Sequence, residues 1–565
     1  MRRNLLFAWT FAFCSIGHAE QYLLNGGQSS EIRYVMTQNF MPGDGVSRLV
    51  MSYVTPKSFT SPGYTQVIRN FDIRFSIPPS SRKSRIDSRG NEILEVEWMN
   101  PRNTVRATLT CTAVNRTELK PLKASAPFPL TGLAPDVRPY LQPTKMIPSA
   151  HPEILKQARR LTASSRTEFD AVQRILSWLV DRVNYVQNPE RYDAVWSLKT
   201  GKGNCQNYSH LAATMMRAVG IPVRIVNGVT LKQPYEMKMP GGTFAMRMAQ
   251  GRHSWIEVYF PDLGWVPFDP QQSELFVSNR FIRVETGLDN EETVNDGSIR
   301  WKRAPRSLQM PLFQEIVDAE FVQDRVELSA ARQSYGPKKL LFSPVVESAF
   351  ENVAFVPEQE AAPVAEPVST RRLDFSMPDT TGNLEYPRGE DFSGFRQARG
   401  SGSDDEFTMN RSFMVETAEY VTGRGERYAQ TFILDRPMRI EQIGLALHPF
   451  GGSGSLWLEV LRDDGNGKPG GLIETSDLIP VGTAKPAAGY DWMDFAFTAR
   501  AMELAAGRYW MVLCYSGSPV VNWFFTYGKP VGPNDGTRYN TLFDENWSRS
   551  LSYEFNFRVI GKTAR

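Results

Sequence analysis

The segment Gly203-Asn204-Cys205-Gln206-Asn207-Tyr208-Ser209-His210 decides the fold of the central part of this chain. After Cys205, apolar side chains recur every three or four residues as far as Val219, which predicts an amphipathic helix. Gly220 and Pro222 end that helix. Cys205 therefore lies at the helix N-terminus, where unpaired backbone N–H groups and the helix dipole favour a thiolate.

Two short segments downstream of the helix complete a set of reactive side chains. His253-Ser254-Trp255-Ile256-Glu257-Val258 alternates as a strand does and begins with an imidazole. Gly264-Trp265-Val266-Pro267-Phe268-Asp269-Pro270 predicts another strand, which ends in a carboxylate. A thiol, an imidazole and a carboxylate are the nucleophile, the base and the group that orients the base in thiol enzymes.

Each of these residues also has a structural explanation when it is taken alone. A cysteine at a helix start is most often a small buried apolar side chain, and an aspartate before a proline is common in turns. Their occurrence together favours catalysis. Of the other histidines, His210 is expected to be a packing or hydrogen-bonding residue, His18 is expected to leave with the signal peptide described below, and His151 and His448 lie in no comparable context.

The segments resemble the transglutaminase-like superfamily, a papain-related fold that includes protein cross-linking enzymes and many bacterial thiol hydrolases. Its members carry a Gly-x-Cys-Gln-x-Tyr/Phe-x-His helix start, a Gly-Ile-Pro-x-Arg turn, a His-x-Trp-x-Glu strand and a Gly-Trp-x-x-x-Asp-Pro strand. This chain has all four in that order, the turn as Gly220–Arg224. Asn207 stands where an acidic residue is common, which is a mild departure. The resemblance implies an α+β core in which Cys205, His253 and Asp269 form a catalytic triad.

Several aromatic residues near these motifs have two explanations that the sequence leaves open. Trp196, Trp255 and Trp265 could line a narrow acyl-binding slot, or they could belong to the core. In the cross-linking enzymes of the family, an aromatic residue upstream of the cysteine assists the oxyanion. Trp178, Tyr185 and Trp196 are upstream candidates here, and the sequence does not choose among them.

The composition predicts a globular protein of several domains. A single core rarely exceeds about 250 to 300 residues, and this chain has 565, of which 41% are apolar and 22% charged. A formal charge of +3, without dense Lys/Arg clusters, argues against nucleic-acid binding.

The N-terminus has the pattern of a secretory signal peptide over residues 1–19. Arg2-Arg3 precedes an apolar stretch from Leu5 to Ile16, and Gly17-His18-Ala19 supplies a small-x-small cleavage site. We expect export to the periplasm or the extracellular space. No other window is long and apolar enough to span a membrane.

Export would leave Cys111, Cys205 and Cys514, and an odd count indicates a free thiol, for which Cys205 is the natural candidate. Cys111 and Cys514 could pair, but we expect two separate buried thiols because they lie in different predicted domains. No zinc-ligand spacing and no acidic loop like the calcium sites of the animal cross-linking enzymes occurs, so no metal or cofactor is expected.

Four regions follow the predicted signal peptide. Residues 20–140 are rich in β-strand patterns and resemble the immunoglobulin-like sandwich that precedes many bacterial cores of this family. Residues 141–345 are the predicted papain/transglutaminase-like α+β core, with its motifs within 150–290. Residues 346–406, rich in Pro, Glu, Gly and Ser, predict a linker. Residues 407–565 resemble a jelly-roll β-sandwich of secreted bacterial proteins.

In such terminal sandwiches an exposed aromatic platform commonly binds glycans. Trp492, Trp523, Tyr527 and Trp547 could supply one, although most of them are expected to be core. The C-terminal domain is therefore either a glycan- or surface-binding module or a structural one.

The favoured function is an exported thiol enzyme that acts on amide bonds of a peptide or protein through a thioester. Resolution by water, which we favour, makes it a cysteine protease or amidase; resolution by a lysine amine makes it a protein-glutamine transglutaminase. The alternative is an inactive transglutaminase-like scaffold whose β-sandwiches bind cell-surface or extracellular glycans.

Overall fold

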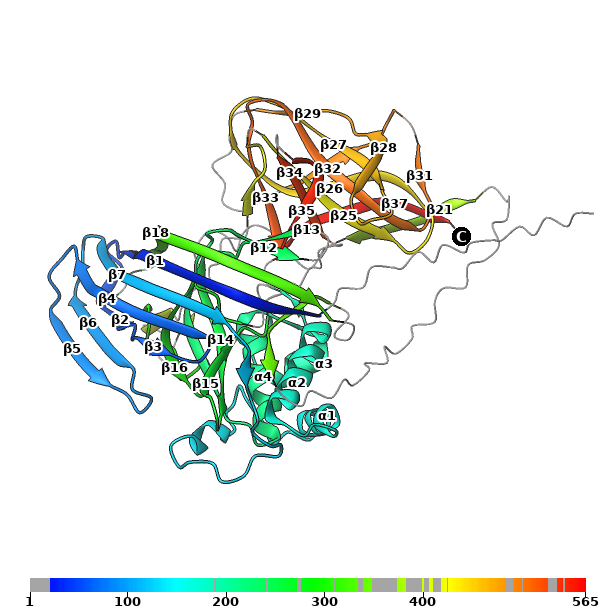
Figure 1. Ribbon diagram of the computed structural model, residues 1–565. Helices are drawn as coiled ribbons and strands as arrows, with labels where there is room; N and C mark the ends of the chain where they lie inside the picture. Colours follow the sequence, from blue (N-terminus) through cyan, green and yellow to red (C-terminus); the bar gives the residue numbers. More distant parts are fainter. Residues whose placement is uncertain are drawn as a thin grey trace, which may run out of the picture.

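The computed structural model describes residues 21–564, except for 187–188, 240–241, 272–275, 306, 308–309, 334–338, 348–372, 383–398, 401–405, 410–417, 424, 483–490, 500, 527–535 and 542–543. The predicted signal peptide therefore lies outside the described residues. Strands dominate the described chain, and the α-helices are gathered in the central region (Figure 1).

Two sheets that contain the N-terminal strands share one apolar core, which includes Ile32, Leu49 and Trp301. The first is one end of a 15-stranded sheet and has the order β18 (Leu312–Arg332), β1 (Gln21–Met41), β7 (Val105–Leu119), β4 (Tyr64–Phe75) and β3 (Phe59–Thr60), with β19 (Leu341–Pro344) parallel to β1. The second has the order β22 (Arg399–Gly400), β23 (Glu406–Met409), β17 (Ser298–Arg303), β2 (Val46–Val54), β6 (Glu92–Met99) and β5 (Ser81–Ile86).

Strands β17 and β18 come from a part of the sequence that we grouped with the core, residues 141–345. In the structure β18 pairs antiparallel with β1 from Tyr22↔Arg332 to Met41↔Leu312, and β17 pairs with β2. The chain thus returns to the N-terminal sheets after it leaves the core. A local sequence pattern shows that a strand is present but does not show its distant partner.

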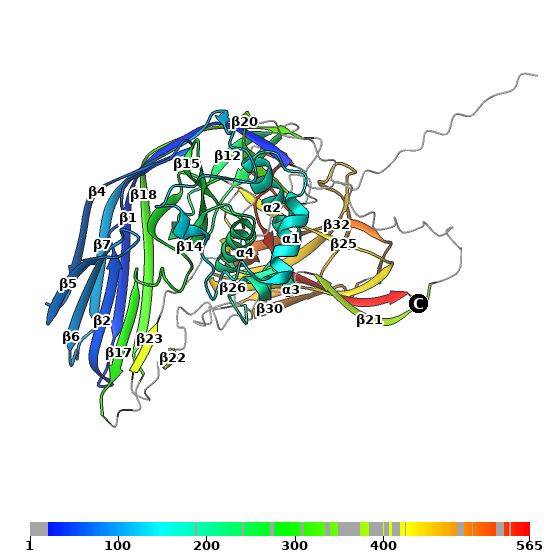
Figure 2. The ribbon, with the colours of Figure 1, turned by 90° about the horizontal axis from the view of Figure 1, so that it is seen from below.

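The central domain has a four-stranded antiparallel sheet with the order β15 (Gly264–Phe268), β14 (Gly251–Phe260), β11 (Val223–Thr230) and β16 (Phe281–Gly287). Helix α4 (Cys205–Ala218) packs on β14 and β11 and is surrounded by α1 (Pro152–Thr162), α2 (Glu168–Arg182) and α3 (Ala194–Thr200) (Figure 2). Short elements connect these parts: β8 (Leu122–Lys123) with β20 (Val346–Glu347), β9 (Asn184–Tyr185) with β10 (Lys202–Gly203), and the 3₁₀-helix η1 (Arg138–Leu141).

The N-terminal strands lie against β16. Tyr64 of β4 donates from its hydroxyl to the carbonyl of Phe281 over 3.0 Å, and Gln66 donates to the carbonyl of Arg283 over 2.9 Å. Asn115 of β7 also donates to the carbonyl of Phe281, over 2.7 Å. The sheet that carries the predicted site residues is therefore held between the helices and the first N-terminal sheet.

The C-terminal region contains two further groups of strands. One contains β28 (Pro469–Thr475), β27 (Gly454–Asp463), β32 (Gly507–Gly517), β25 (Glu426–Leu434), β34 (Thr537–Thr541) and β35 (Asp544–Leu551), with β29 (Ile479–Val481) on β27. The other contains β21 (Phe375–Gly382), β37 (Phe557–Ala564), β26 (Met438–Gly451), β33 (Val520–Thr526) and β24 (Ala418–Tyr420), with β30 (Asp491–Ala496), β31 (Met502–Leu504) and β36 (Glu554–Phe555) paired onto them.

The C-terminal strands are joined to the central region by a parallel pairing of β35 with β13 (Gly242–Met246), which itself pairs with β12 (Tyr235–Met239). Ser552 also donates to the carbonyl of Arg247 over 3.0 Å. Within the predicted linker, residues 346–406, the described parts contain strands: β21 pairs with β37 and β22 pairs with β23.

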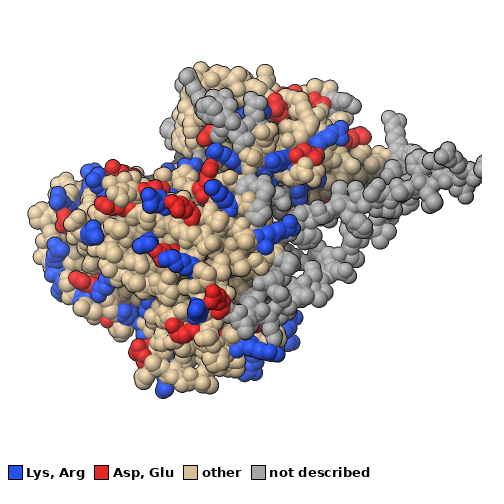
Figure 3. Space-filling model, in the orientation of Figure 1, with Lys and Arg blue, Asp and Glu red and all other residues tan. Residues whose placement is uncertain are grey.

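Acidic and basic side chains are interspersed on the face of the molecule shown in Figure 3. Within the part of the chain that the structure describes, no helix has the length and apolar character needed to cross a membrane.

Candidate active site

Cys205 is the first residue of α4, and two asparagines fix the start of that helix. The side chain of Asn204 accepts from the backbone N–H of Gln206 over 3.1 Å, and the side chain of Asn207 accepts from the N–H of Asn204 over 3.2 Å. This reciprocal capping box satisfies donors that a helix start leaves unpaired. Gly203 has no Cβ, and one placed there would lie 2.3 Å from Cβ of Asn207. Asn207 is therefore a structural residue of the helix start.

His253 and Asp269 meet at the ends of neighbouring strands. His253 lies near the start of β14 and Asp269 follows the last residue of β15, which is the antiparallel partner of β14. Nε2 of His253 is 2.9 Å from Oδ2 of Asp269, and both side chains are fully buried. The Cys205 side chain hydrogen-bonds the same imidazole. The structure thus brings together the three residues that the sequence predicted as a triad.

The environment of His253 favours the protonated ring. Burial alone would lower the pKa of this imidazole, but the charge and hydrogen bond of Asp269 and the hydrogen bond of Cys205 outweigh it and raise the pKa to about 9. An imidazole that keeps its proton at neutral pH is suited to hold a thiolate beside it.

The aromatic residues near the motifs have different positions. The ring of Trp255 stacks on His253 with centroids 5.9 Å apart, and Phe281 lies edge-on to both rings. Trp255 is only 1% exposed. Gly228 makes room for it, because a Cβ there would lie 2.5 Å from Cη2 of the indole. Trp255 and Phe281 are thus packing residues that hold the ring of His253.

Among the described residues, no hydrogen bond, ion pair or ring contact joins Trp265 or Trp196 to a residue of the triad. Trp265 packs against Tyr140 and Tyr259 and under the guanidinium of Arg224, whose carbon is 4.2 Å from the ring centroid. Trp196 is half-buried on α3, where its backbone N–H is bound by Asp193 over 3.0 Å. Neither position adds support to a role in substrate binding.

Of the upstream aromatic candidates, Tyr185 lies nearest to the nucleophile in the strand pairing. It is buried and stands opposite Gly203, two residues before Cys205, in the β9–β10 pair. Trp178 is half-buried on α2 and packs against the main core. His210 is fully buried, and its two ring nitrogens contact the carbonyl of Tyr192 and the N–H of Asn290 at 2.7 and 3.2 Å, which is the structural role expected for it.

Sequence reasoning missed two residues beside His253. Arg252, next to it in β14, is 2% exposed and forms ion pairs with Asp296 and with Glu315, the latter at 2.8 Å. Gln271, fully buried, lies 3.5 Å through its Nε2 from Nδ1 of His253. A glutamine two residues after the predicted acid was a signal that the motif pattern did not use.

Cys111 and Cys514 are free, buried thiols, as the sequence analysis expected. Burial raises the pKa of Cys111 to about 12 and that of Cys514 to about 11, so both stay protonated at neutral pH. Among the described residues, no group of three or more His, Cys, Asp and Glu side chains is arranged to hold a metal ion.

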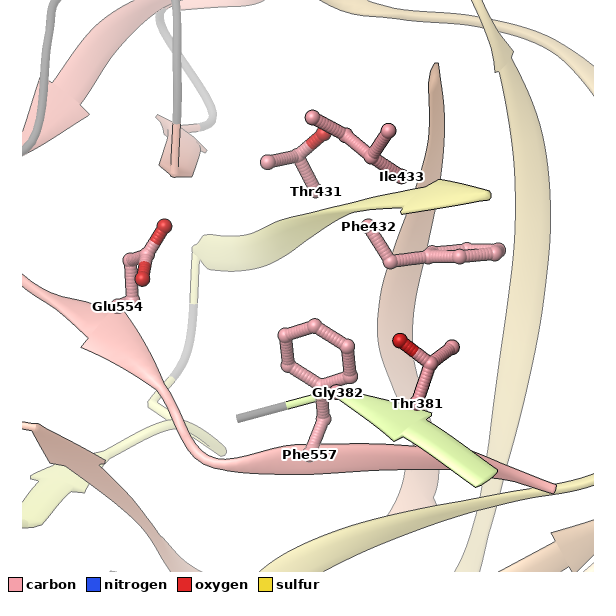
Figure 4. A pocket seen from close by; sticks show the side chains of 7 residues that line it. All are labelled: Thr381, Gly382, Thr431, Phe432, Ile433, Glu554 and Phe557. Atoms are coloured by element: carbon pink, nitrogen blue, oxygen red, sulfur yellow. The ribbon is translucent and has the colours of Figure 1, made fainter. Parts of the chain in front are cut away.

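A pocket with a volume of about 210 Å³ lies in the C-terminal region, and none of the triad residues lines it (Figure 4). Its walls are Thr381 and Gly382 of β21, Thr431, Phe432 and Ile433 of β25, Glu554, and Phe557 of β37. The residues suggested for a glycan platform lie elsewhere: Trp523 is fully buried against Phe555, Trp547 is buried, and Trp492 packs under Arg558. Tyr527 lies outside the described residues.

A helix that presents a buried cysteine to a histidine–aspartate pair on an antiparallel sheet defines the class of papain-like folds. Residues 156–270 match the family model for the transglutaminase-like superfamily, and this part of the chain belongs to that superfamily.

Known proteins are similar to parts of this chain. The Bacillus subtilis (strain 168) protein named uncharacterized protein YebA is 32% identical over 133 residues, which are 22% of this chain and 18% of that protein. A Pseudomonas aeruginosa protein named protein-glutamine gamma-glutamyltransferase is 29% identical over 123 residues, 20% of this chain and 18% of that protein. The chain thus spans less than a fifth of either relative. A crystal structure described as that of a candidate cysteine protease from Cytophaga hutchinsonii has 17% identity and a TM-score of 0.37, over 56% of this chain and 95% of that one.

Proposed function

We propose that this chain is an exported thiol enzyme that acts on amide bonds of a peptide or protein, with Cys205 as nucleophile, His253 as base and Asp269 as the group that orients the base. The observation that carries the proposal is the buried hydrogen bond of 2.9 Å between His253 and Asp269, on an imidazole that also hydrogen-bonds Cys205. Membership of the superfamily supports the chemistry but does not select the substrate.

The reaction follows from the roles of the three groups. Because Asp269 occupies Nε2 of His253, Nδ1 is the ring nitrogen left to take the proton of the thiol. The thiolate of Cys205 then attacks the amide carbonyl, and the tetrahedral intermediate collapses to a thioester as His253 gives its proton to the departing amine. Backbone N–H groups at the start of α4 are suited to stabilise the oxyanion.

The acceptor that resolves the thioester distinguishes the two reaction types. Water gives a protease or amidase, and a lysine amine gives a transglutaminase. We favour hydrolysis because the sequence has the pattern of an exported, bacterial-type protein with a single core of this family. The similarity to a protein named protein-glutamine gamma-glutamyltransferase keeps amine transfer as the competing reaction, but the match covers only a fifth of this chain.

The decisive experiment measures the alkylation rate of Cys205 against pH in the wild type and in His253→Ala. Fast labelling below about pH 7 that collapses in the variant is the expected result, because only a thiolate–imidazolium pair reacts there. Labelling that rises only near the ordinary thiol pKa of about 8.5 in both proteins would exclude the triad and favour the inactive scaffold. Release of an amine from peptide amides, scored with and without an added primary amine, then separates hydrolysis from transfer.

Export and the flanking domains belong to the same proposal. The predicted signal peptide over 1–19 supports export, and N-terminal sequencing of the mature protein, expected to begin at Glu20, tests it. We also propose that the N-terminal sheets form an immunoglobulin-like sandwich and the C-terminal strands a jelly-roll-like one.

A second candidate function is favoured by the pocket in Figure 4. Its volume of about 210 Å³ is below the range of about 300–1,000 Å³ typical of drug-sized ligands, and it combines two phenyl rings with the polar groups of Thr381, Thr431 and Glu554. We propose that it takes a single sugar ring of a cell-surface or extracellular glycan. Glycan-array binding of the full chain that is lost in Thr381→Trp supports this; equal binding by both proteins contradicts it.

A further inference from the structure

Gln271 is connected to both members of the histidine–aspartate pair. Its backbone N–H donates to Oδ1 of Asp269 over 3.2 Å, while the other carboxylate oxygen of Asp269 binds His253. Its side chain turns back, and Nε2 lies 3.5 Å from Nδ1 of His253. The side chain is fully buried. Gln271 therefore touches the one ring nitrogen that Asp269 leaves available.

The hydrogen-bonding capacity of Gln271 is only half used. Oε1 of Gln271 is buried and accepts no hydrogen bond from the described residues. Buried carbonyl oxygens nearly always have a donor, so an unpaired one beside a group that changes protonation state needs an explanation. A carboxamide can supply either a donor or an acceptor, because rotation of its terminal group exchanges the N–H₂ and the oxygen.

The two protonation states of His253 require opposite faces of this amide. A neutral ring whose proton sits on Nε2, toward Asp269, offers a lone pair at Nδ1 and accepts from the N–H₂ group. An imidazolium offers an N–H at Nδ1, and of the two groups of the amide only the oxygen can accept it. That second bond has a charged donor, and charge-assisted bonds are roughly twice as strong as neutral ones. The charged ring is also the state that the surroundings of His253 favour.

We propose that Gln271 is a positioning residue, which orients the ring of His253 and, with its carbonyl oxygen turned to Nδ1, stabilises the imidazolium. The proposal rests on the proposed function. The proton moves from the Cys205 thiol to Nδ1 and later to the departing amine, and Gln271 only accepts a hydrogen bond meanwhile. When the thiolate is consumed by attack on the carbonyl, Oε1 of Gln271 remains as an acceptor for the Nδ1 proton.

The test compares alkylation of Cys205 by iodoacetamide across pH in the wild type, Gln271→Met, Gln271→Glu and the control Gln173→Met. Gln271→Met keeps the length of the side chain but removes both donor and acceptor. We expect its labelling rate below pH 7 to fall about tenfold and the inflection to move up by about one pH unit, as for the loss of one charge-assisted bond. Gln271→Glu keeps an acceptor and should retain the rapid labelling at low pH.

Gln173 is a matched control because it is also a buried glutamine of the same domain, and it donates to Ser343 over 3.0 Å, with no contact to His253. Its methionine variant should have the wild-type pH profile. Thermal unfolding of all variants reports whether each one folds.

The outcomes separate this inference from the proposed function. A wild type without rapid labelling below pH 7 overturns the triad itself. A wild type with rapid labelling and a superimposable Gln271→Met profile leaves the triad standing and overturns the role of Gln271. Equal loss in Gln271→Met and Gln271→Glu, with both folded, also overturns it, because the donor rather than the acceptor would then be needed.

Discussion

At the residue scale, the hydrogen bond between Asp269 and His253 should have the largest effect on the proposed chemistry. Asp269→Asn keeps the shape but removes the charge that raises the pKa of His253 to about 9. With that charge gone, burial lowers the pKa of His253 and only Cys205 still raises it, so the pKa should fall well below about 9, and the ring tautomer should no longer be fixed. Turnover should fall by about 10³- to 10⁴-fold, as for the comparable change in other triads.

The measurement is kcat/KM for amide hydrolysis, together with the pH profile of Cys205 labelling. The control is Asp464→Asn, an exposed turn residue of the C-terminal region that, within the described parts of the chain, accepts hydrogen bonds from nearby backbone N–H groups. Unchanged turnover in Asp269→Asn would remove Asp269 from the mechanism.

Glu168 gives a prediction for stability against pH. This carboxyl, at the start of α2, is fully buried, and its two oxygens have no hydrogen-bond partner among the described residues. Burial, and secondarily the charge of Asp262, raise its pKa to about 9. Its neutral form is thus the folded form, so the stability it contributes is complete below about pH 4.5 and is lost as the pH rises through about 9.

At neutral pH the carboxyl of Glu168 ionises when the chain unfolds, which favours the unfolded state. Glu168→Gln removes this ionisation. We expect the free energy of unfolding to rise by up to about 3 kcal/mol at pH 7, less the remaining cost of an unpaired amide, with a smaller decline toward pH 9. Chemical denaturation at pH 5, 7 and 9 measures this, with Glu153→Gln on the exposed side of α1 as control. A pH dependence identical to that of the wild type would show that Glu168 is solvated.

At the scale of elements, the first turn of α4 should affect the reactivity of Cys205 more than the rest of the helix does. The capping box of Asn204 and Asn207 holds the turn that presents Cys205. Asn204→Ala should reduce stability by about 1 kcal/mol and also reduce the labelling rate of Cys205, since the helix start would fray at the nucleophile.

Thr167→Ala is the matched control, because Thr167 caps α2 by accepting from Asp170 N over 3.2 Å and has no contact with the triad. It should show a similar loss of stability in thermal unfolding but an unchanged labelling rate. If both variants label alike, the cap does not position Cys205.

The helix, its start and its end were predictable from the sequence because they depend on local signals, the apolar spacing and Gly220 before Pro222. The meeting of His253 and Asp269 was predictable only through the resemblance to a family, since strand order is not a local property. The contact of Gln271 with His253 was not predicted, because the motifs end at Pro270 and the contact depends on a side chain that turns back on the pair. The return of β18 to β1 was missed for the same reason: Arg33 and Glu320 lie 287 positions apart and yet form an ion pair.

At the scale of the whole molecule, the N-terminal sheets are connected to the candidate site by the ion pairs of Arg252. Glu315 of β18 binds Arg252, the neighbour of His253 in β14, at 2.8 Å, and both side chains are at most 5% exposed. Gln38 of β1 donates to the same carboxylate over 2.7 Å. Asp296, just before β17, is the second carboxylate on the guanidinium. These sheets should therefore unfold together with the central domain rather than as an independent unit.

Glu315→Ala tests this coupling, because it removes one of the two carboxylates that bind the buried guanidinium of Arg252. Complete loss of the partner of a buried charge costs about 3–5 kcal/mol, and the loss here should lie below that range because Asp296 remains bound to Arg252.

The control Glu320→Ala lies on the same strand and breaks the ion pair between Glu320 and Arg33. Because the side chain of Arg33 is 62% exposed and that of Glu320 65%, the loss of stability should be below about 1 kcal/mol. In the wild type, calorimetry should show one unfolding transition for the N-terminal and central parts together. In Glu315→Ala the whole transition should move to a lower temperature, and Cys205 should lose its reactivity at that same lower temperature. The contrary result is a wild type whose N-terminal sheets unfold in a separate transition while Cys205 stays reactive above it. The sheets would then cover the central domain without holding His253 in place.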